Sequence, residues 1–417
     1  MHYVARRALL PAVIALLASA VGASGSAEAS NGAAASHGGS PSTVTVGLID
    51  SLTGPAASSV VPILPGVQAR IALQNARGGV NGHKINLVVE DDQSSPTVDL
   101  TAAQVLVSKG AVAIDNTSFV AYGSARYLQQ QGMPVVGPGY DGPEWGQQPN
   151  TNMFSFTTLL WDQHAPQYRG PGQFLKQHGA TSLATFAYAD IPSTTTVARG
   201  IEFEANQAGI KTGYLNTSLP LGPLNAEPLA LAMKSANVDA VSMPLSLSTC
   251  LAILTALLQT GLKPKVVISD NGYGQPVLDD PSALQAGQGV YFAQPFAPVE
   301  LHTAATKIFQ AALAKYEHYT EIPDNEYYYG WISADLLIKG LQVAGKNPTS
   351  HSYIAGLRKV HNYDAGGLIP VPIDFSQFGR APHESCQWFV RLTGTKFIPD
   401  PRSGKPVCGS LIPNSNQ

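Results

Sequence analysis

The 417-residue sequence has few charged side chains. Only 13% of its residues are Asp, Glu, Lys or Arg, about half of the roughly 25% usual in soluble proteins, and the formal net charge is -3. A chain without a strong positive field does not attract polyanions, so the composition argues against nucleic acid as a partner. Hydrophobic residues make up 44% of the chain, which excludes a disordered or collagen-like protein.

Motifs of the common enzyme classes are also absent. No G-x-x-x-x-G-K-[ST] occurs and no G-x-G-x-x-G follows the first predicted strand, so no nucleotide cofactor is expected. The ten histidines are scattered without H-E-x-x-H or paired Cys/His spacing, which argues against a metal centre. No G-x-S-x-G surrounds Ser51, Ser118 or Ser193. We therefore predict that the protein is not an enzyme, with a hydrolase as the less favoured alternative.

Residues 1–29 have the pattern of a secretory signal peptide. Arg6 and Arg7 precede an almost uninterrupted apolar run from Ala8 to Ala23, and Ala27-Glu28-Ala29 resembles a signal cleavage site. The run is shorter than the ~20 residues that a membrane span requires. We predict export to the periplasm or cell exterior, association with the cell surface, and no stable membrane insertion after cleavage.

The segment that follows, residues 30–42, is rich in Gly, Ser and Ala and is expected to form a flexible leader. The three cysteines are Cys250, Cys386 and Cys408. In an exported protein the pattern favours a disulfide between Cys386 and Cys408. Cys250 lies in an apolar helical pattern and is expected to be a buried small hydrophobe.

Predicted strands and helices alternate along the chain. The first series has strands at 44–50, 85–90, 111–115 and 133–137, with helices at 66–76, before 109 and at 122–131. A second series has helices at 163–178, 194–208 and 247–259, with strands at 183–188, 238–243 and 266–269. This order predicts an α/β fold with two doubly wound parallel-sheet lobes.

After about Tyr291 the pattern becomes helical, at 301–316, 325–344 and 352–360, and strands at 368–375 and 387–398 close the chain. The late helices have no strands of their own to cover. We therefore expect them to pack on the first lobe, so that the chain crosses between the lobes more than once.

Several segments resemble the leucine/isoleucine/valine-binding proteins, which are type I solute-binding proteins of ABC transporters. The segment Asn75 to Lys84, followed by a strand and Asp91-Asp92, resembles their N-A-x-G-G-x-x-G-x-x segment. Further similar segments are Val44 to Pro55, Gly132 to Trp145, Gln259 to Leu262, Tyr327 to Gly345 and Pro370 to Gly379. The resemblance covers roughly Val44 to Ile398.

The resemblance implies two lobes that close on a small solute and are joined by three hinge crossings, which we place near Thr157, Ala293 and Ile369. Lobe 1 would comprise 43–157 plus 294–368, and lobe 2 would comprise 158–293 plus 369–417. It also implies capture of a small polar solute, an amino acid or related compound, for an ABC transporter permease. A ligand-sensing receptor component of the same fold is the alternative.

Site residues follow from the loops at the strand ends, where ligands of parallel sheets gather, and from the resemblance. The resemblance places Ser118 at the carboxylate-binding serine and Gly139 at a backbone contact. It places Asp141 where a hydroxyl is usual and Asn271, beside Asp270, where an acid is usual. The predicted ligand-binding residues are Ser118, Phe119, Gly139, Tyr140, Asp141, Tyr188, Asp190, Ser246 and Asn271.

These departures suggest a ligand that need not be a zwitterion. Asp141 would accept hydrogen bonds from a donor-rich or cationic group. Two alternatives stay open, because Asp141 precedes Gly142-Pro143 and fits a turn, and because Ser118 fits a helix N-cap without a ligand role.

Overall fold

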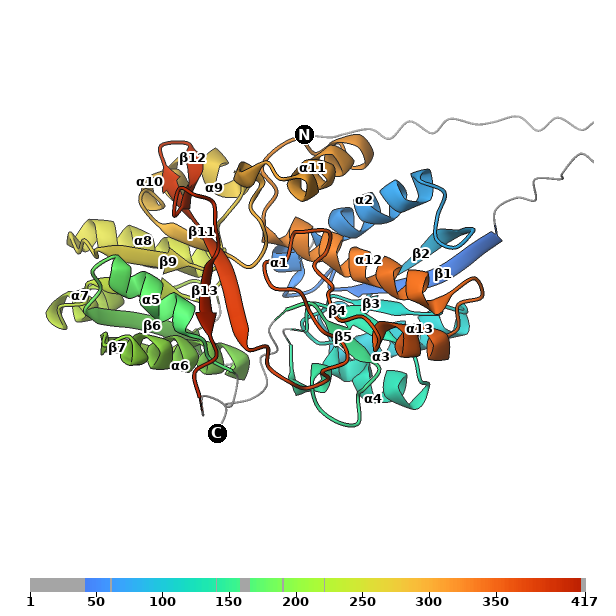
Figure 1. Cartoon of the computed structure of the whole chain (residues 1–417). Helices are drawn as coiled ribbons and strands as arrows, with labels where there is room; N and C mark the ends of the chain where they lie inside the picture. The colour runs from blue at the N-terminus through green and yellow to red at the C-terminus, as the bar shows by residue number, and fades with distance from the viewer. Residues whose placement is uncertain are drawn as a thin grey trace, which may run out of the picture. The chain divides into compact units, whose positions relative to one another are not determined.

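The computed structural model describes residues 42–60, 62–139, 141–157, 166–189, 191–220 and 222–413 (Figure 1). The predicted signal peptide and nearly all of the leader lie outside these residues. Two β-sheets organise the described part of the chain. No described helix is long and apolar enough to cross a membrane.

The first sheet has five parallel strands in the order β2-β1-β3-β4-β5. They are β1 (Ser42–Asp50), β2 (His83–Asp91), β3 (Ile114–Asn116), β4 (Val135–Gly137) and β5 (Met153–Ser155). The apolar, β-branched sequence of β1 is buried along most of its length, as a central strand requires. The connecting helices are α1 (Ala57–Val60), α2 (Ile63–Ala76), α3 (Pro96–Ser108) and α4 (Tyr122–Gln130), with a 3₁₀ turn η1 (Pro143–Trp145).

The second sheet has eight strands in the order β12-β11-β10-β9-β8-β6-β7, with β13 paired to β11. Its parallel part consists of β6 (Ser182–Tyr188), β7 (Lys211–Leu219), β8 (Ala240–Met243), β9 (Val266–Ser269) and β10 (Tyr291–Gln294). Its antiparallel extension consists of β11 (Glu384–Thr393), β12 (Lys396–Asp400) and β13 (Val407–Ser410). The helices are α5 (Arg169–Gln177), α6 (Pro192–Gln207), α7 (Glu227–Ser235), α8 (Leu247–Thr260), α9 (Gln275–Asp279) and α10 (Pro281–Ala286).

The late helices pack beside the first sheet, as expected. They are α11 (Ala304–Tyr316), α12 (Asn325–Ala344) and α13 (Ser350–Leu357), preceded by the 3₁₀ turn η3 (Val299–Leu301). Both α11 and α12 contact α2, and α13 contacts α12 (Figure 1). A Cβ atom on Gly66 or Gly330 would overlap the backbone of the facing helix, so glycine permits this close approach of α2 and α12.

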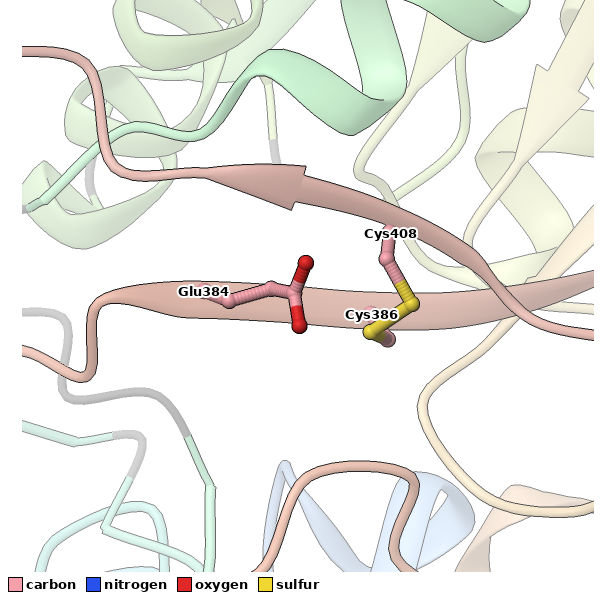
Figure 2. Close-up of side chains that lie close together, drawn as sticks. All are labelled: Glu384, Cys386 and Cys408. Carbon is pink, nitrogen blue, oxygen red and sulfur yellow. A yellow bond between two sulfur atoms is a disulfide. The ribbon is translucent and has the colours of Figure 1, made fainter.

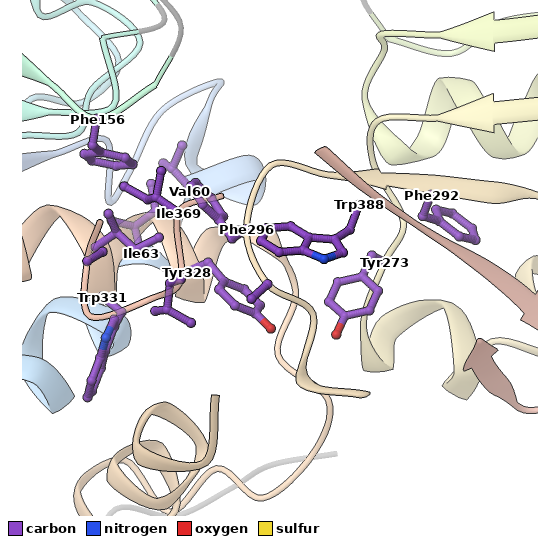
Figure 3. Close-up of a cluster of buried hydrophobic side chains, with 14 of the residues drawn as sticks. Val60, Ile63, Phe156, Tyr273, Phe292, Phe296, Tyr328, Trp331, Ile369 and Trp388 are labelled. Atoms are coloured by element: carbon purple, nitrogen blue, oxygen red, sulfur yellow. The ribbon is translucent and has the colours of Figure 1, made fainter. Parts of the chain in front are cut away.

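One hydrophobic cluster extends from the first sheet to the second (Figure 3). Phe296, which follows β10, stacks on Tyr328 of α12 with ring centroids 5.9 Å apart. Tyr273, which follows β9, lies beside Tyr328 and donates its hydroxyl to Glu300 over 2.8 Å. Aromatic side chains therefore fill the region where the chain passes from β10 to the late helices.

The disulfide predicted from the sequence is present. Cys386 and Cys408 lie directly opposite each other on the antiparallel strands β11 and β13, and their sulfurs are bonded (Figure 2). The third cysteine, Cys250, is buried in α8 with a free thiol.

One predicted strand is absent from the structure, and one predicted helix is shorter than expected. No strand forms at 368–375, where a single bridge joins Tyr363 and Ile373, because Pro370 and Pro372 have no N–H group to donate to a ladder. The helix predicted at 163–178 is present as α5, which begins at Arg169, and residues 163–165 lie outside the described residues. Among the described elements that the sequence pattern did not predict are the strands β5, β7, β10 and β13 and the helices α1, α7, α9 and α10.

The contacts of residues 360–375 help to locate the third crossing between the lobes, which the sequence predicted near Ile369. Phe375 donates its N–H to the Val360 carbonyl and packs its ring edge-on against Phe154 of β5. This segment therefore lies beside the first sheet, and the second-sheet strand β11 begins only at Glu384. The contacts favour a crossing after Phe375 over one at Ile369, and the lobe boundaries stay predictions.

Candidate ligand-binding site

Polar side chains from three strands of the first sheet meet at the carboxyl edge of that sheet. Ser51 follows β1, Asp92 follows β2 and Ser118 follows β3, and all three are buried. The Ser51 hydroxyl donates to Asp92 Oδ1 over 2.7 Å and lies 3.4 Å from Ser118 Oγ. Because parallel strands end at one edge, residues far apart in sequence come together there. Ser51 and Asp92 were not among the predicted site residues, although each directly follows a strand of the sheet.

Ser118 closes a local turn as well. Its hydroxyl accepts the Val120 N–H over 2.9 Å, and its own N–H donates to Asn116 Oδ1 over 3.2 Å. The N-cap of α4 is Ala121, so Ser118 does not cap that helix. The neighbouring Phe119 and Tyr122 are exposed, at 41% and 51% of their surface, and offer aromatic faces beside this edge.

Gly139 and Asp141 lie in the loop after β4. Gly139 has a φ of +68°, and a Cβ there would lie 2.5 Å from Ser155 Oγ, so this position requires glycine. Asp141 accepts hydrogen bonds from Tyr122 N at 2.9 Å and Trp145 Nε1 at 2.7 Å, one on each carboxylate oxygen. These contacts support the interpretation of Asp141 as a loop-forming residue, and its ligand contact stays a prediction.

Glu144, in the 3₁₀ turn after Asp141, is buried, and its carboxyl interacts with that of Asp141. Burial and the charge of Asp141 raise the pKa of Glu144 to about 9, and burial also raises the pKa of Asp141. A proton is therefore retained on Glu144 at neutral pH, which limits repulsion between the two carboxyls.

Three further predicted residues meet at the carboxyl edge of the second sheet. The Tyr188 hydroxyl donates to Thr249 Oγ1 over 2.8 Å and accepts the Ser246 N–H over 3.0 Å. Asn271 donates its amide to the Leu245 carbonyl over 2.8 Å, which joins the loop after β9 to the loop after β8. The predicted residues Tyr140 and Asp190 lie outside the described residues.

Further polar side chains lie at the start of α12, where no sequence motif predicted a site. The Asn325 amide donates to the Asp270 carbonyl over 3.3 Å, and Glu326 follows on the first turn of the helix. Burial raises the pKa of Asp270 to about 7. Burial and the charges of Asp324 and Asp50 raise the pKa of Glu326 well above its ordinary value.

These groups suit hydrogen bonding to a solute better than catalysis. Ser51 and Ser118 have carboxylate or hydroxyl neighbours but no hydrogen bond to a histidine among the described residues. The described side chains that approach metal-ligand spacing are Glu384, Cys386 and Cys408 (Figure 2). Because the two sulfurs are bonded to each other, they do not offer thiolates to a metal.

Two cavities lie away from these loops. One of about 410 Å³ is bordered by α7, α8 and α10, and its lining includes Leu251, Glu227 and Asp280. Another of about 200 Å³ is lined by Arg70 and Asp335, which form a partly buried ion pair. Neither includes a predicted site residue.

Comparison with known proteins gives consistent results. Leu/Ile/Val-binding protein homolog 2 of Brucella abortus is 26% identical over 200 residues, which are 48% of this chain and 53% of that protein. The chain thus spans about half the length of the curated relatives it matches.

Two solved structures share the fold. A fatty acid ABC transporter substrate-binding protein from Thermomonospora curvata superimposes with a TM-score of 0.70 at 18% identity, covering 90% of this chain and 94% of that one. A solute-binding protein from R. palustris in complex with benzoate gives 0.69 at 17% identity, covering 89% and 97%.

The sequence profile described as "Periplasmic binding protein" matches residues 43–396, which include both sheets apart from the final strands. Proteins of this family bind solutes outside the cytoplasm and are not enzymes. The fold, with its two sheets built on parallel strands, is consistent with this match. The chain therefore belongs to the periplasmic binding protein family.

Proposed function

We propose that this protein captures a small polar solute between its two lobes and delivers it to an ABC transporter permease. The observation that carries the proposal is the meeting of polar groups at the carboxyl edge of each sheet. Ser51, Asp92 and Ser118 meet at the first edge, and Tyr188 and Ser246 meet at the second. Hydroxyl, amide and carboxylate groups at such edges are suited to orient a polar ligand.

Closure is the expected mechanism. A solute that contacts both edges gains its full set of hydrogen bonds only when the lobes close, so it shifts the population toward the closed form. The permease would then recognise that form. The signal pattern of residues 1–29 supports export, which would bring the protein to the outer side of the membrane that holds the permease.

The solute class is an amino acid or a related small polar compound. Similar proteins are described as binding ligands of different classes, and the benzoate complex is one example. The hydroxyls and amides of this chain make hydrogen bonds the main source of its selectivity.

A thermal-shift screen of the mature chain tests the proposal, with amino acids, amides, amines and aromatic acids as probes. At least one class should raise the melting temperature, and small-angle scattering with that compound should show a smaller radius of gyration. Ser118→Ala should weaken the shift, whereas Ser235→Ala, at an exposed hydroxyl at the end of α7, should not. Absence of any stabilising compound together with unchanged scattering would overturn the proposal.

A further inference from the structure

The smaller of the two cavities lies between α2, α12 and the segment 362–366. Its volume is about 200 Å³. Asp335, which lines it, is roughly 15 Å along α12 from Asn325, the first residue of the helix, at the usual rise of about 1.5 Å per residue. The cavity is therefore separate from the polar groups at the start of α12, and an occupant would be a second ligand.

Arg70 of α2 gives this cavity N–H donors that have no partner. The residue is 9% exposed, its Nε donates to Asp335 Oδ1 over 2.8 Å, and its Nη1 donates to Gln74 Oε1 over 3.2 Å. A guanidinium carries five N–H groups, and no described residue accepts the two on Nη2. Nη2 is not sealed in the core, so these two groups can reach a molecule in the cavity that Arg70 lines.

Neighbouring side chains hold the guanidinium of Arg70 in place. The Tyr363 hydroxyl donates to Asp335 Oδ2 over 3.2 Å, so each oxygen of Asp335 has a donor. The Cζ atom of Arg70 also lies 5.6 Å from the centre of the Trp331 ring. An arginine that is already paired and packed loses little conformational entropy when it binds a ligand, so this donor pair is preorganised.

Two further charged side chains line the cavity, Lys339 of α12 and Asp364 of the segment 362–366. No ion pair joins them, and the Lys339 ammonium has no partner within the described chain. Asp364 Oδ1 accepts the N–H of Gly366 over 3.0 Å. Because Arg70 and Asp335 neutralise each other, the unmatched charges of the cavity are one ammonium and one carboxylate.

We infer that this cavity is a second binding site, which takes a small carboxylate through Arg70 Nη2 and the Lys339 ammonium. A carboxylate accepts several hydrogen bonds and donates none, which complements a guanidinium edge and an ammonium that only donate. A zwitterionic amino acid would add an ammonium for Asp364 to accept. The occupant would join α2 and α12 to the segment 362–366, which leads to Phe375 and the third crossing between the lobes.

A matched set of small probes tests the charge requirement in ligand-observed NMR titrations of the mature protein. Propionate carries the carboxylate, propionamide has the same chain without charge, ethylamine carries only a cation, and alanine is the zwitterion. We expect propionate to bind, alanine to bind more tightly, and propionamide and ethylamine not to bind in the cavity. Binding of propionamide or ethylamine as tight as that of propionate would overturn the inference, and so would absence of binding by both propionate and alanine.

Variants locate the bound carboxylate. Lys339→Gln should weaken propionate binding by up to about fivefold, because it removes a partly exposed charge partner. Arg70→Lys keeps a cation beside Asp335 but removes the Nη2 donors, and it should weaken binding by roughly tenfold. Lys346→Gln, at an exposed lysine that does not line the cavity, is the matched control and should bind as the wild type does.

The same titrations separate the two sites. Loss of propionate binding in Ser118→Ala together with full binding in Lys339→Gln would place the carboxylate at the edge of the first sheet. That result would overturn the second site and leave the proposed capture of a solute standing.

Discussion

The two sheets carry different chemistry at their carboxyl edges. In the first sheet, Asp50 and Asp92 are buried and each keeps one carboxylate oxygen without a partner among the described residues. In the second sheet, the hydroxyls of Tyr188, Ser246 and Thr249 bond to one another. The buried carboxylates of the first edge thus keep unmatched acceptor oxygens, whereas the three hydroxyls of the second edge satisfy one another.

The second sheet also contains the one disulfide found among the described residues. Of the changes proposed here, its removal should lower the free energy of unfolding the most. Cys386→Ser together with Cys408→Ser opens a loop with a sequence separation of 22, and chain-entropy reasoning gives a loss of about 3 kcal/mol in unfolding free energy. Urea unfolding followed by tryptophan fluorescence measures it. A reductant should destabilise the wild type and leave the double variant unchanged. An unchanged urea midpoint in the variant would contradict this prediction.

The hydrogen bonds at the two edges should differ in strength. Ser51→Ala removes a donor to the buried carboxylate of Asp92, and we expect a loss of about 2 kcal/mol. Ser248→Ala at the second edge removes an exposed hydroxyl that lies 3.2 Å from Ser246 Oγ, and it should cost under about 0.5 kcal/mol. Denaturation midpoints of the two variants, measured side by side, compare the edges. Equal losses of unfolding free energy in the two variants would show that the hydrogen bonds of the two edges do not differ in strength.

Because the first sheet contains buried acids with raised pKa values, we expect the free energy of unfolding to fall as the pH rises. Burial raises the pKa of Asp115 to about 8, above its ordinary 3.8, so the folded state retains a proton that the unfolded state has lost. The stabilising contribution is complete below pH 4 and disappears as the pH rises to about 8. Asp115→Asn should reduce the decline by up to about 1.4 kcal/mol per pH unit. Urea midpoints at several pH values test this, and identical slopes for both proteins would oppose it.

Asp239, directly before β8 of the second sheet, should make the free energy of unfolding depend on pH in the opposite direction. Hydrogen bonds from Lys265, Thr181 and Ser182 outweigh burial and lower its pKa to about 2. Its contribution is therefore present above about pH 4 and is lost as the pH falls toward 2. Asp239→Asn should cost about 1 kcal/mol at neutral pH, with the difference narrowing in acid. A constant difference from pH 7 to pH 2 would indicate that charge is not its source.

The α/β alternation was predictable because buried parallel strands are short apolar runs between amphipathic helices. The strand β7 was missed because it lies at the sheet edge, where half-buried residues such as Thr212 and Asn216 replace the apolar run. The strand predicted at 368–375 failed for the converse reason, since its apolar residues alternate with two prolines.

The candidate site was predictable only where it follows a strand directly. Ser118, Tyr188 and Ser246 lie in or beside strand-end loops that the pattern reveals. Asn325 and Glu326 begin a helix that resembles any other in sequence, and they are 55 and 56 residues from Asp270. Their proximity arises from the packing of the late helices, which local sequence does not encode.

The pairing of β13 with β11 has a mechanical consequence. Ile412 donates its N–H to the Gln167 carbonyl, so the segment after β13 lies beside the entry to α5. The Tyr168 hydroxyl donates to the Pro382 carbonyl, which holds the entry to α5 near the entry to β11. A pulling force applied at the C-terminus would peel away only the residues beyond Cys408. The disulfide would then transmit the load to Cys386 in β11, and the intervening segment, including β12, would contribute no extension until the bond is reduced.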